Sequence, residues 1–146
     1  MNNAATATAT DIGTIQVNGT NLKVSDAGII VVPDLDADHH FALPAVEKGL
    51  AFEFWYNGTA ADASDWHIKT RSTTNYMMGG CAIHDTDNGG DDTAIIDADN
   101  NSNNHLNILT PAVGTIIRLC CDGLLWHLNG TVIGATDTAV VFADHA

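Results

Sequence analysis

The stretch that most restricts the fold of this chain is Gly114–Ile133, which reads GTIIRLCCDGLLWHLNGTVI. Its short apolar runs are separated by Asp122-Gly123 and by Asn129-Gly130. These two dipeptides supply the positive φ angles that tight hairpin turns need, so they predict two two-residue turns. The strands that these turns would join are Thr115–Cys121, Leu124–Leu128 and Thr131–Ile133. Such a meander of strands is typical of an all-β domain.

The rest of the chain repeats this pattern of short strands. No window shows a helical period, and turn residues recur about every eight to twelve positions, which predicts about ten to twelve strands. The clearest is Leu50–Tyr56, LAFEFWY, in which large apolar residues alternate with Ala51, Glu53 and Trp55. That alternation indicates a strand with one buried face. Further strands are expected at Ile12–Val17, Leu22–Val24, Gly28–Val32, His39–Leu43, Asp65–Thr70, Tyr76–Ile83, Thr93–Ile96, Leu106–Leu109 and Thr138–Ala143.

These strands predict one domain, an antiparallel β-sandwich of jelly-roll-like type, over residues 12–146. Residues 1–11 form a low-complexity run of Asn, Ala and Thr with no apolar period. We therefore expect a flexible N-terminal arm in front of the sandwich.

The charge of the chain excludes two classes of partner. It carries 18 acidic and 5 basic residues, a net charge of −13. Such a chain is repelled by nucleic-acid phosphates and by anionic lipid surfaces, so we expect neither nucleic acid nor a membrane as a partner. The sequence also lacks a secretory signal and an apolar run of membrane-spanning length. Cys81, Cys120 and Cys121 are odd in number and two are adjacent, which favours free thiols and folding in a reducing cytoplasm.

Neither the acidic loops nor the histidines show the spacing of a known metal site. The Asp-rich segments 34–38, 85–92 and 97–99 lack the glutamate that an EF-hand carries at its twelfth position. The seven histidines show no zinc-site spacing, and His39 and His40 would point to opposite faces of a strand. We therefore expect no metal and no cofactor, with calcium in the Asp-rich loops as the alternative.

We also expect that the chain is not an enzyme, because it contains neither a nucleophile elbow nor a phosphate-binding loop. A Cys–His nucleophile built on Cys81 or Cys120 would require a histidine brought close by the fold. Glu47 and Glu53 are too close in sequence for a convincing glycosidase pair.

Two segments together resemble a family of virus proteins. Leu43–Tyr56, LPAVEKGLAFEFWY, is similar to the "LP, spacer, Gly, aromatic strand" segment of many tailed-bacteriophage virion proteins. Gly114–Gly130 resembles their C-terminal segment of Gly, apolar strand, Asp-Gly and Trp. Here Cys121 and Leu124-Leu125 replace the more usual polar or aliphatic residues. The chain thus resembles small β-rich virion proteins of the capsid decoration (cement) or head-fibre type.

The resemblance implies a homotrimer on the outer surface of the phage head, in contact with the major capsid protein. Such a virion protein is assembled in the host cytoplasm and stabilises the expanded shell through many modest contacts. The arm would bind the capsid through Ala4, Thr6, Thr8, Thr10, Ile12 and Ile15. Trimer contacts or core packing would involve Trp55, Trp126 and Phe142.

Other functions are consistent with a β-sandwich. One is a tail-fibre or receptor-binding module, in which an exposed Trp66 and the acidic loops of residues 85–104 hold a carbohydrate or calcium. Strand tryptophans more often pack in a core, which weighs against this alternative. A hydrolase built on a jelly roll is the least favoured.

Overall fold

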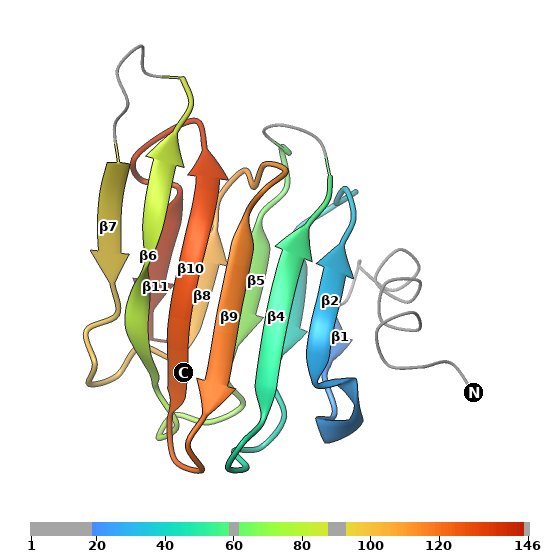
Figure 1. Cartoon of the computed structure of the whole chain (residues 1–146), viewed down its shortest axis with the longest axis vertical. Helices are drawn as coiled ribbons and strands as arrows, with labels where there is room; N and C mark the ends of the chain where they lie inside the picture. The colour runs from blue at the N-terminus through green and yellow to red at the C-terminus, as the bar shows by residue number, and fades with distance from the viewer. Residues whose placement is uncertain (1–18, 59–61, 88–92, 145–146) are drawn as a thin grey trace.

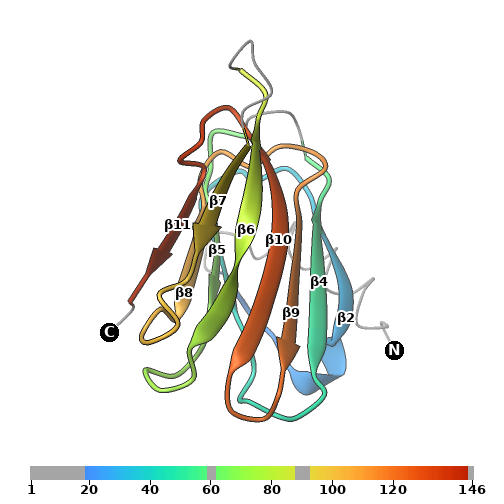
Figure 2. The same cartoon turned by 60° about the vertical axis from the view of Figure 1, so that its left-hand side comes forward.

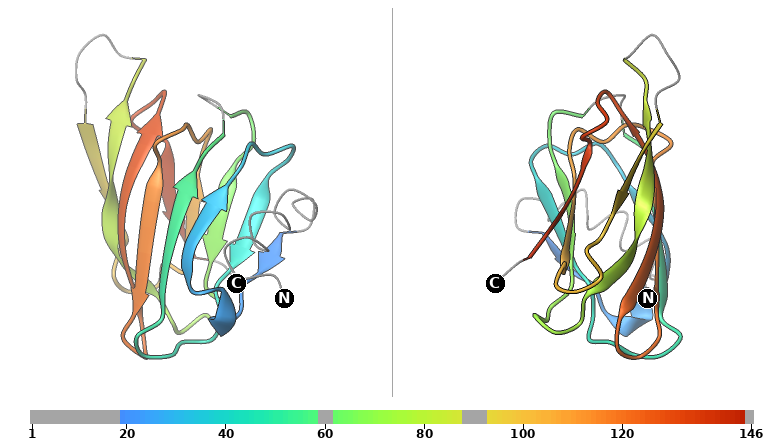
Figure 3. Two further views of the ribbon diagram at one scale, coloured as in Figure 1. Left: turned by 45° about the vertical axis from the view of Figure 1, so that its right-hand side comes forward. Right: turned by 90° about the vertical axis from the view of Figure 1, so that its left-hand side faces the viewer.

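The computed structural model describes residues 19–58, 62–87 and 93–144, and these form two β-sheets packed face to face (Figure 1). Within these ranges the only helical element is a single 3₁₀ turn, η1 (Val24–Asp26). The oblique view of Figure 2 and the right-hand panel of Figure 3, turned by 90° from Figure 1, show the two layers side by side. The predicted all-β sandwich is confirmed.

Each sheet draws its strands from distant parts of the sequence. The five-stranded sheet has the order β1-β3-β5-β8-β11, and the six-stranded sheet the order β2-β4-β9-β10-β6-β7. The first sheet contains β1 (Thr20–Asn21), β3 (His39–Ala42), β5 (Trp66–Lys69), β8 (His105–Ile108) and β11 (Val140–Ala143). The second contains β2 (Gly28–Val32), β4 (Ala51–Tyr56), β6 (Met77–Asp85), β7 (Thr93–Asp97), β9 (Ile116–Cys121) and β10 (Trp126–Gly134).

Both sheets are mixed, whereas the sequence predicted antiparallel ones. Parallel pairing joins β1 to β3, β3 to β5, β2 to β4 and β6 to β10. The reason is that the chain alternates between layers. From β3 it crosses to β4 in the other sheet and returns as β5, so β5 enters the first sheet in the same direction as β3.

The core lies between the sheets and follows the predicted alternation. On β4 and just before it, Leu50, Phe52, Phe54 and Tyr56 are all buried, while Trp55 faces outward. Ring centroids of Phe54 and Trp66 are 5.7 Å apart, which joins β4 to β5 across the two layers. Each large aromatic side chain buries a large apolar area, so this contact contributes to holding the two sheets together.

The segment Gly114–Ile133 forms one hairpin rather than two. The predicted position of the turn at Asp122-Gly123 is confirmed, because β9 and β10 pair antiparallel and Gly123 has a φ of 103°. Its predicted length of two residues is wrong, because Cys121 pairs with Trp126 and four residues connect the strands. The predicted turn at Asn129-Gly130 is wrong, because β10 runs straight through both residues. Gly130 pairs with Ile117 on one side and Cys81 on the other.

Close packing explains the glycine that the sequence pattern assigned to a turn. A Cβ atom on Gly130 would lie 2.6 Å from Ile117 Cδ1 and 2.7 Å from Cys81 Sγ. Gly130 therefore leaves room for the side chains of both neighbouring strands, and its φ angle is not positive. The same residue type serves turns and crowded strand centres, and only the tertiary structure separates the two.

The beginning of the chain departs from the predicted hairpin. Residues 1–18, which include the predicted arm and the strand Ile12–Val17, lie outside the described residues. The expected strand Leu22–Val24 is wrong. Strand β1 ends at Asn21, and the backbone N–H of Lys23 donates to the Asp26 carboxylate at 2.8 Å, which caps the 3₁₀ turn η1. The remaining strands lie close to their predicted positions.

Candidate functional site

Three histidines from three neighbouring strands meet on the outer face of the five-stranded sheet. His40 on β3 lies opposite His67 on β5, and their rings stack with centroids 4.1 Å apart. His105 on β8 lies on the far side of His67, with 2.9 Å between His67 Nδ1 and His105 Nε2. One ring nitrogen of each residue lies within 4.8 Å of the other two. We call His40, His67 and His105 the histidine cluster.

Strand alternation positions these side chains. On β5, Trp66 and Ile68 are fully buried in the core, so His67 between them points to the opposite face. On β3, His39 packs edge-on against Phe41 at 4.6 Å between centroids and is buried. His40 therefore faces outward, and the prediction that His39 and His40 occupy opposite faces is confirmed.

Two carboxylates lie beside the histidine cluster. Asp38, Asp65 and His67 bring their ligand atoms within 4.8 Å of one another. The backbone N–H of Asp65 donates to Asp38 Oδ1 at 2.8 Å, which joins the segments that lead into β3 and β5. Burial raises the pKa of the Asp65 carboxyl, and the nearby charge of Asp38 acts in the same direction.

His67 is the central and most deeply buried member of the cluster, with 9% of its surface exposed. Burial lowers its pKa to about 4, and the charges of His40 and Lys69 act in the same direction. The imidazole is therefore neutral at pH 7 and keeps one nitrogen lone pair. A neutral imidazole is the form that can coordinate a metal ion or accept a hydrogen bond.

Reasoning from the sequence missed this cluster because it looked for ligands close together in the chain. His67 and His105 are 38 residues apart. The available signal was a histidine in each of two predicted strands, His40 and His67, and a third, His105, directly before the predicted strand Leu106–Leu109. These histidines can be predicted to form a cluster only when the strand order, which places β3, β5 and β8 side by side, is known.

The acidic loops show carboxylates engaged by the protein itself. Asp99 Oδ1 accepts hydrogen bonds from the backbone N–H groups of Asn101, Ser102 and Asn103 at 2.9, 2.9 and 3.0 Å. These donors hold the pKa of Asp99 well below its usual range. The carboxylate thus closes a loop in the manner of an Asx turn. Residues 88–92 of the second acidic loop lie outside the described residues.

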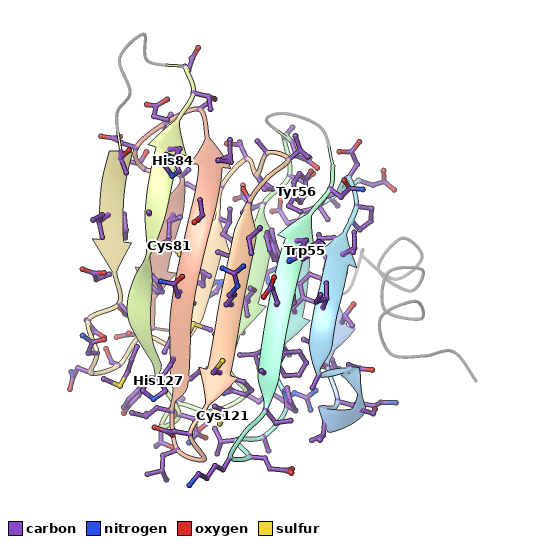
Figure 4. The ribbon with its side chains drawn as sticks, viewed as in Figure 1. Trp55, Tyr56, Cys81, His84, Cys121 and His127 are labelled. Atoms are coloured by element: carbon purple, nitrogen blue, oxygen red, sulfur yellow. The ribbon has the colours of Figure 1, made fainter. Side chains whose placement is uncertain are left out.

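The aromatic residues predicted for trimer or core packing have separate environments. Trp126 is fully buried, Phe142 is half-buried against the core, and Trp55 is 41% exposed on the outer face of β4 (Figure 4). Trp66 is fully buried, so the alternative in which an exposed Trp66 holds a carbohydrate is wrong. The predicted capsid-binding residues, Ala4 to Ile15, lie outside the described residues.

Trp55 borders an open apolar hollow of about 350 Å³ on the outer face of the six-stranded sheet. Val31, Val113 and Ile116 line it from the neighbouring strand β2, the loop before β9 and β9 itself. We call Val31, Trp55, Val113 and Ile116 the Trp55 face. Apolar surface of this kind, centred on a tryptophan, is typical of protein contacts.

The cysteines and Glu53 lie in different environments, and the β9–β10 ladder places His127 opposite Cys120. Cys81 is buried, which raises the pKa of its thiol to about 12. Cys120 is exposed and Cys121 is buried, so the two adjacent thiols face opposite sides, as predicted. Glu53 is held by Arg118 at 2.8 Å, and the hydrogen bond from Arg118 lowers its pKa, which keeps the carboxylate ionised.

Comparison with protein-family models, with curated proteins and with solved structures finds no match to this chain. Across the described residues no helix is both long and apolar enough to cross a membrane.

Proposed function

We propose that this chain is a virion structural protein: a capsid decoration (cement) protein that binds the outer surface of a phage head as a trimer and stabilises the expanded shell. The observation that carries the proposal is the pairing of the two segments that resemble phage virion proteins. Leu43–Tyr56 contributes β4, and Gly114–Gly130 contributes β9 and the first half of β10. Strand β4 pairs with β9, and β9 with β10, at the centre of the six-stranded sheet.

The two parts of the resemblance therefore belong to one three-stranded unit, and this supports reading them as a single signature. A sheet with a packed core also suits a cement protein, because such a protein must hold its contacts in fixed geometry under load. Many modest contacts on a repeating lattice then add up through avidity.

In this proposal the Trp55 face forms the contact between protomers, and the N-terminal arm binds the major capsid protein. Tryptophan is enriched at the centres of protein interfaces, where burial of its ring contributes most. The two contacts lie in different parts of the chain, so they can be tested separately.

The coat contact is tested by deleting residues 1–11 and measuring occupancy on expanded capsids. We expect the deletion to abolish binding while the circular dichroism of the sandwich stays unchanged. Binding to unexpanded capsids serves as the comparison, since the wild-type chain should prefer the expanded lattice. Undiminished occupancy of the deletion variant would remove the arm from the proposal.

The trimer contact is tested by Trp55→Ala, with Leu124→Ala as the matched control. Leu124 is 71% exposed and lies outside the Trp55 face. We expect sedimentation to show monomers for Trp55→Ala and trimers for Leu124→Ala. Monomers in the wild-type chain at all concentrations would contradict the trimer.

A tail-fibre module remains the alternative function, because the same sandwich could sit at the end of a fibre. It differs from the cement proposal in location and copy number within the particle. Both are structural functions, and neither requires a catalytic residue.

A further inference from the structure

We propose that the histidine cluster binds one divalent transition-metal ion, of the zinc, nickel and copper class, through one ring nitrogen each of His40, His67 and His105. This inference goes beyond the proposed virion function and does not depend on it.

The kind of donor selects the class of metal. Three imidazole nitrogens are borderline-soft ligands that suit zinc, nickel and copper. Calcium and magnesium take oxygen ligands, so a site of three histidines discriminates against them. The histidine cluster is therefore chemically distinct from the Asp-rich loops of the chain.

The distances fit with small movements of the rings. Zinc–nitrogen bonds of about 2.0–2.1 Å in tetrahedral geometry place ligand nitrogens roughly 3.3 Å apart. The present separation of His67 Nδ1 and His105 Nε2 is 2.9 Å, and the third nitrogen lies within 4.8 Å of both. A ring rotation of His40 and a slight opening of the His67–His105 pair would complete three ligand positions.

Coordination is balanced in protons and electrons. In the neutral pair, one of the two facing nitrogens carries the proton of the His67–His105 contact. On metal binding that ring changes tautomer and carries its proton on its other nitrogen, so both facing lone pairs become available. The three nitrogens replace three waters of the hydrated ion, and no redox step is involved.

The scaffold holds the ligands on adjacent, hydrogen-bonded strands. Strand β5, which carries His67, pairs with β3 on one side and β8 on the other, so all three ligand backbones are fixed by the ladder. A site built on strands keeps its geometry better than one built on loops. Burial of His67 also limits water at the centre of the cluster.

The charges around the cluster favour a cation. Asp38 and Asp65 lie beside His67, and carboxylates next to metal-binding histidines typically orient the rings and strengthen binding. The chain as a whole carries a net charge of −13, which attracts divalent cations to its surface. Lys69, which pairs with His105 in the ladder, opposes this attraction locally.

The test is zinc titration of the untagged, chelator-treated full chain by calorimetry. Excess calcium in the buffer occupies carboxylate sites elsewhere, so the heat released on adding zinc comes from zinc binding to the histidines. We expect one equivalent of zinc. Removal of a direct ligand in His67→Ala or His105→Ala should weaken binding by more than about 100-fold, because even indirect partners of a ligand cost 10–100-fold.

The matched controls are His84→Ala and His127→Ala, two exposed histidines outside the cluster, which should bind zinc like the wild type. Cobalt supplies an independent signal, since binding to the cluster gives visible absorption bands that His105→Ala should remove. His105 is only half-buried, so this variant keeps the test valid if His67→Ala does not fold. Absence of zinc binding by the folded chain would overturn the proposal. Unchanged affinity in both cluster variants would also overturn it.

Discussion

Gly130→Ala tests the assignment of Asn129-Gly130 to a continuous strand. The added Cβ would lie 2.6 Å from Ile117 Cδ1 and 2.7 Å from Cys81 Sγ, whereas ordinary contacts are near 3.4–4 Å. Both neighbours must shift, and overpacking of this kind costs about 1–3 kcal/mol. Alanine loses less conformational entropy on folding than glycine does, which offsets this cost by about 0.5–1 kcal/mol. Taking the middle of each range, we expect a net loss of about 1 kcal/mol.

Urea unfolding followed by circular dichroism measures this loss. A fall in the melting temperature of about 2–4 °C should accompany it, because a loss of about 1 kcal/mol lowers the melting temperature of a chain near this size by roughly that amount. Thr131→Ala is the matched control, because Thr131 is half-buried on the other face of the same strand and its replacement should change stability by about 0.5 kcal/mol or less.

A double mutant separates overpacking from a turn. Ile117→Val removes the Cδ1 atom that the new Cβ would touch, so it should relieve part of the cost in Gly130→Ala. Contacting residues show coupling energies of about 0.5–3 kcal/mol in such cycles. Strict additivity, or a Gly130→Ala variant as stable as the wild type, would refute the assignment of Gly130 to a crowded strand centre.

Two further predictions concern buried polar and thiol groups. Tyr56→Phe removes the hydroxyl that donates a hydrogen bond to the buried Asp62 carboxylate. The free energy of unfolding should fall by about 1–3 kcal/mol, because water cannot reach the buried carboxylate to replace the lost donor. Urea unfolding checks this, and an unchanged midpoint would contradict the role of that hydrogen bond. Under native conditions a thiol reagent should label only Cys120, because Cys81 and Cys121 are buried and the pKa of Cys81 is raised to about 12. Unfolding in urea should expose all three thiols, and rapid labelling of three in the folded chain would be inconsistent with the structure.

The sequence predicted the strands whose alternation is strong. Leu50–Tyr56 has large apolar residues at every second position, and all of them are buried. The position of the turn at Asp122-Gly123, though not its length, was predicted correctly, because local hydrogen bonds form there: Asp122 Oδ1 accepts from the backbone N–H groups of Leu124 and Leu125. In both cases the determining interactions are local, so they can be read from a few residues.

The errors occurred where long-range contacts decide the structure. Asn129-Gly130 has the composition of a turn, but Ile117 and Cys81 on neighbouring strands require the glycine for space. The histidine cluster depends on the order β3-β5-β8, which alternation within single strands does not specify. Parallel pairing was missed for the same reason, since it follows from how the chain alternates between sheets.

The proposed virion function is tested most directly by counting this chain in purified phage particles. Quantitative mass spectrometry gives its copy number relative to the major capsid protein, and electron cryomicroscopy gives its position. The proposal predicts a copy number comparable with that of the capsid protein, with trimers on the outer surface of the head. A handful of copies at the tail, or absence from the particle, would contradict it.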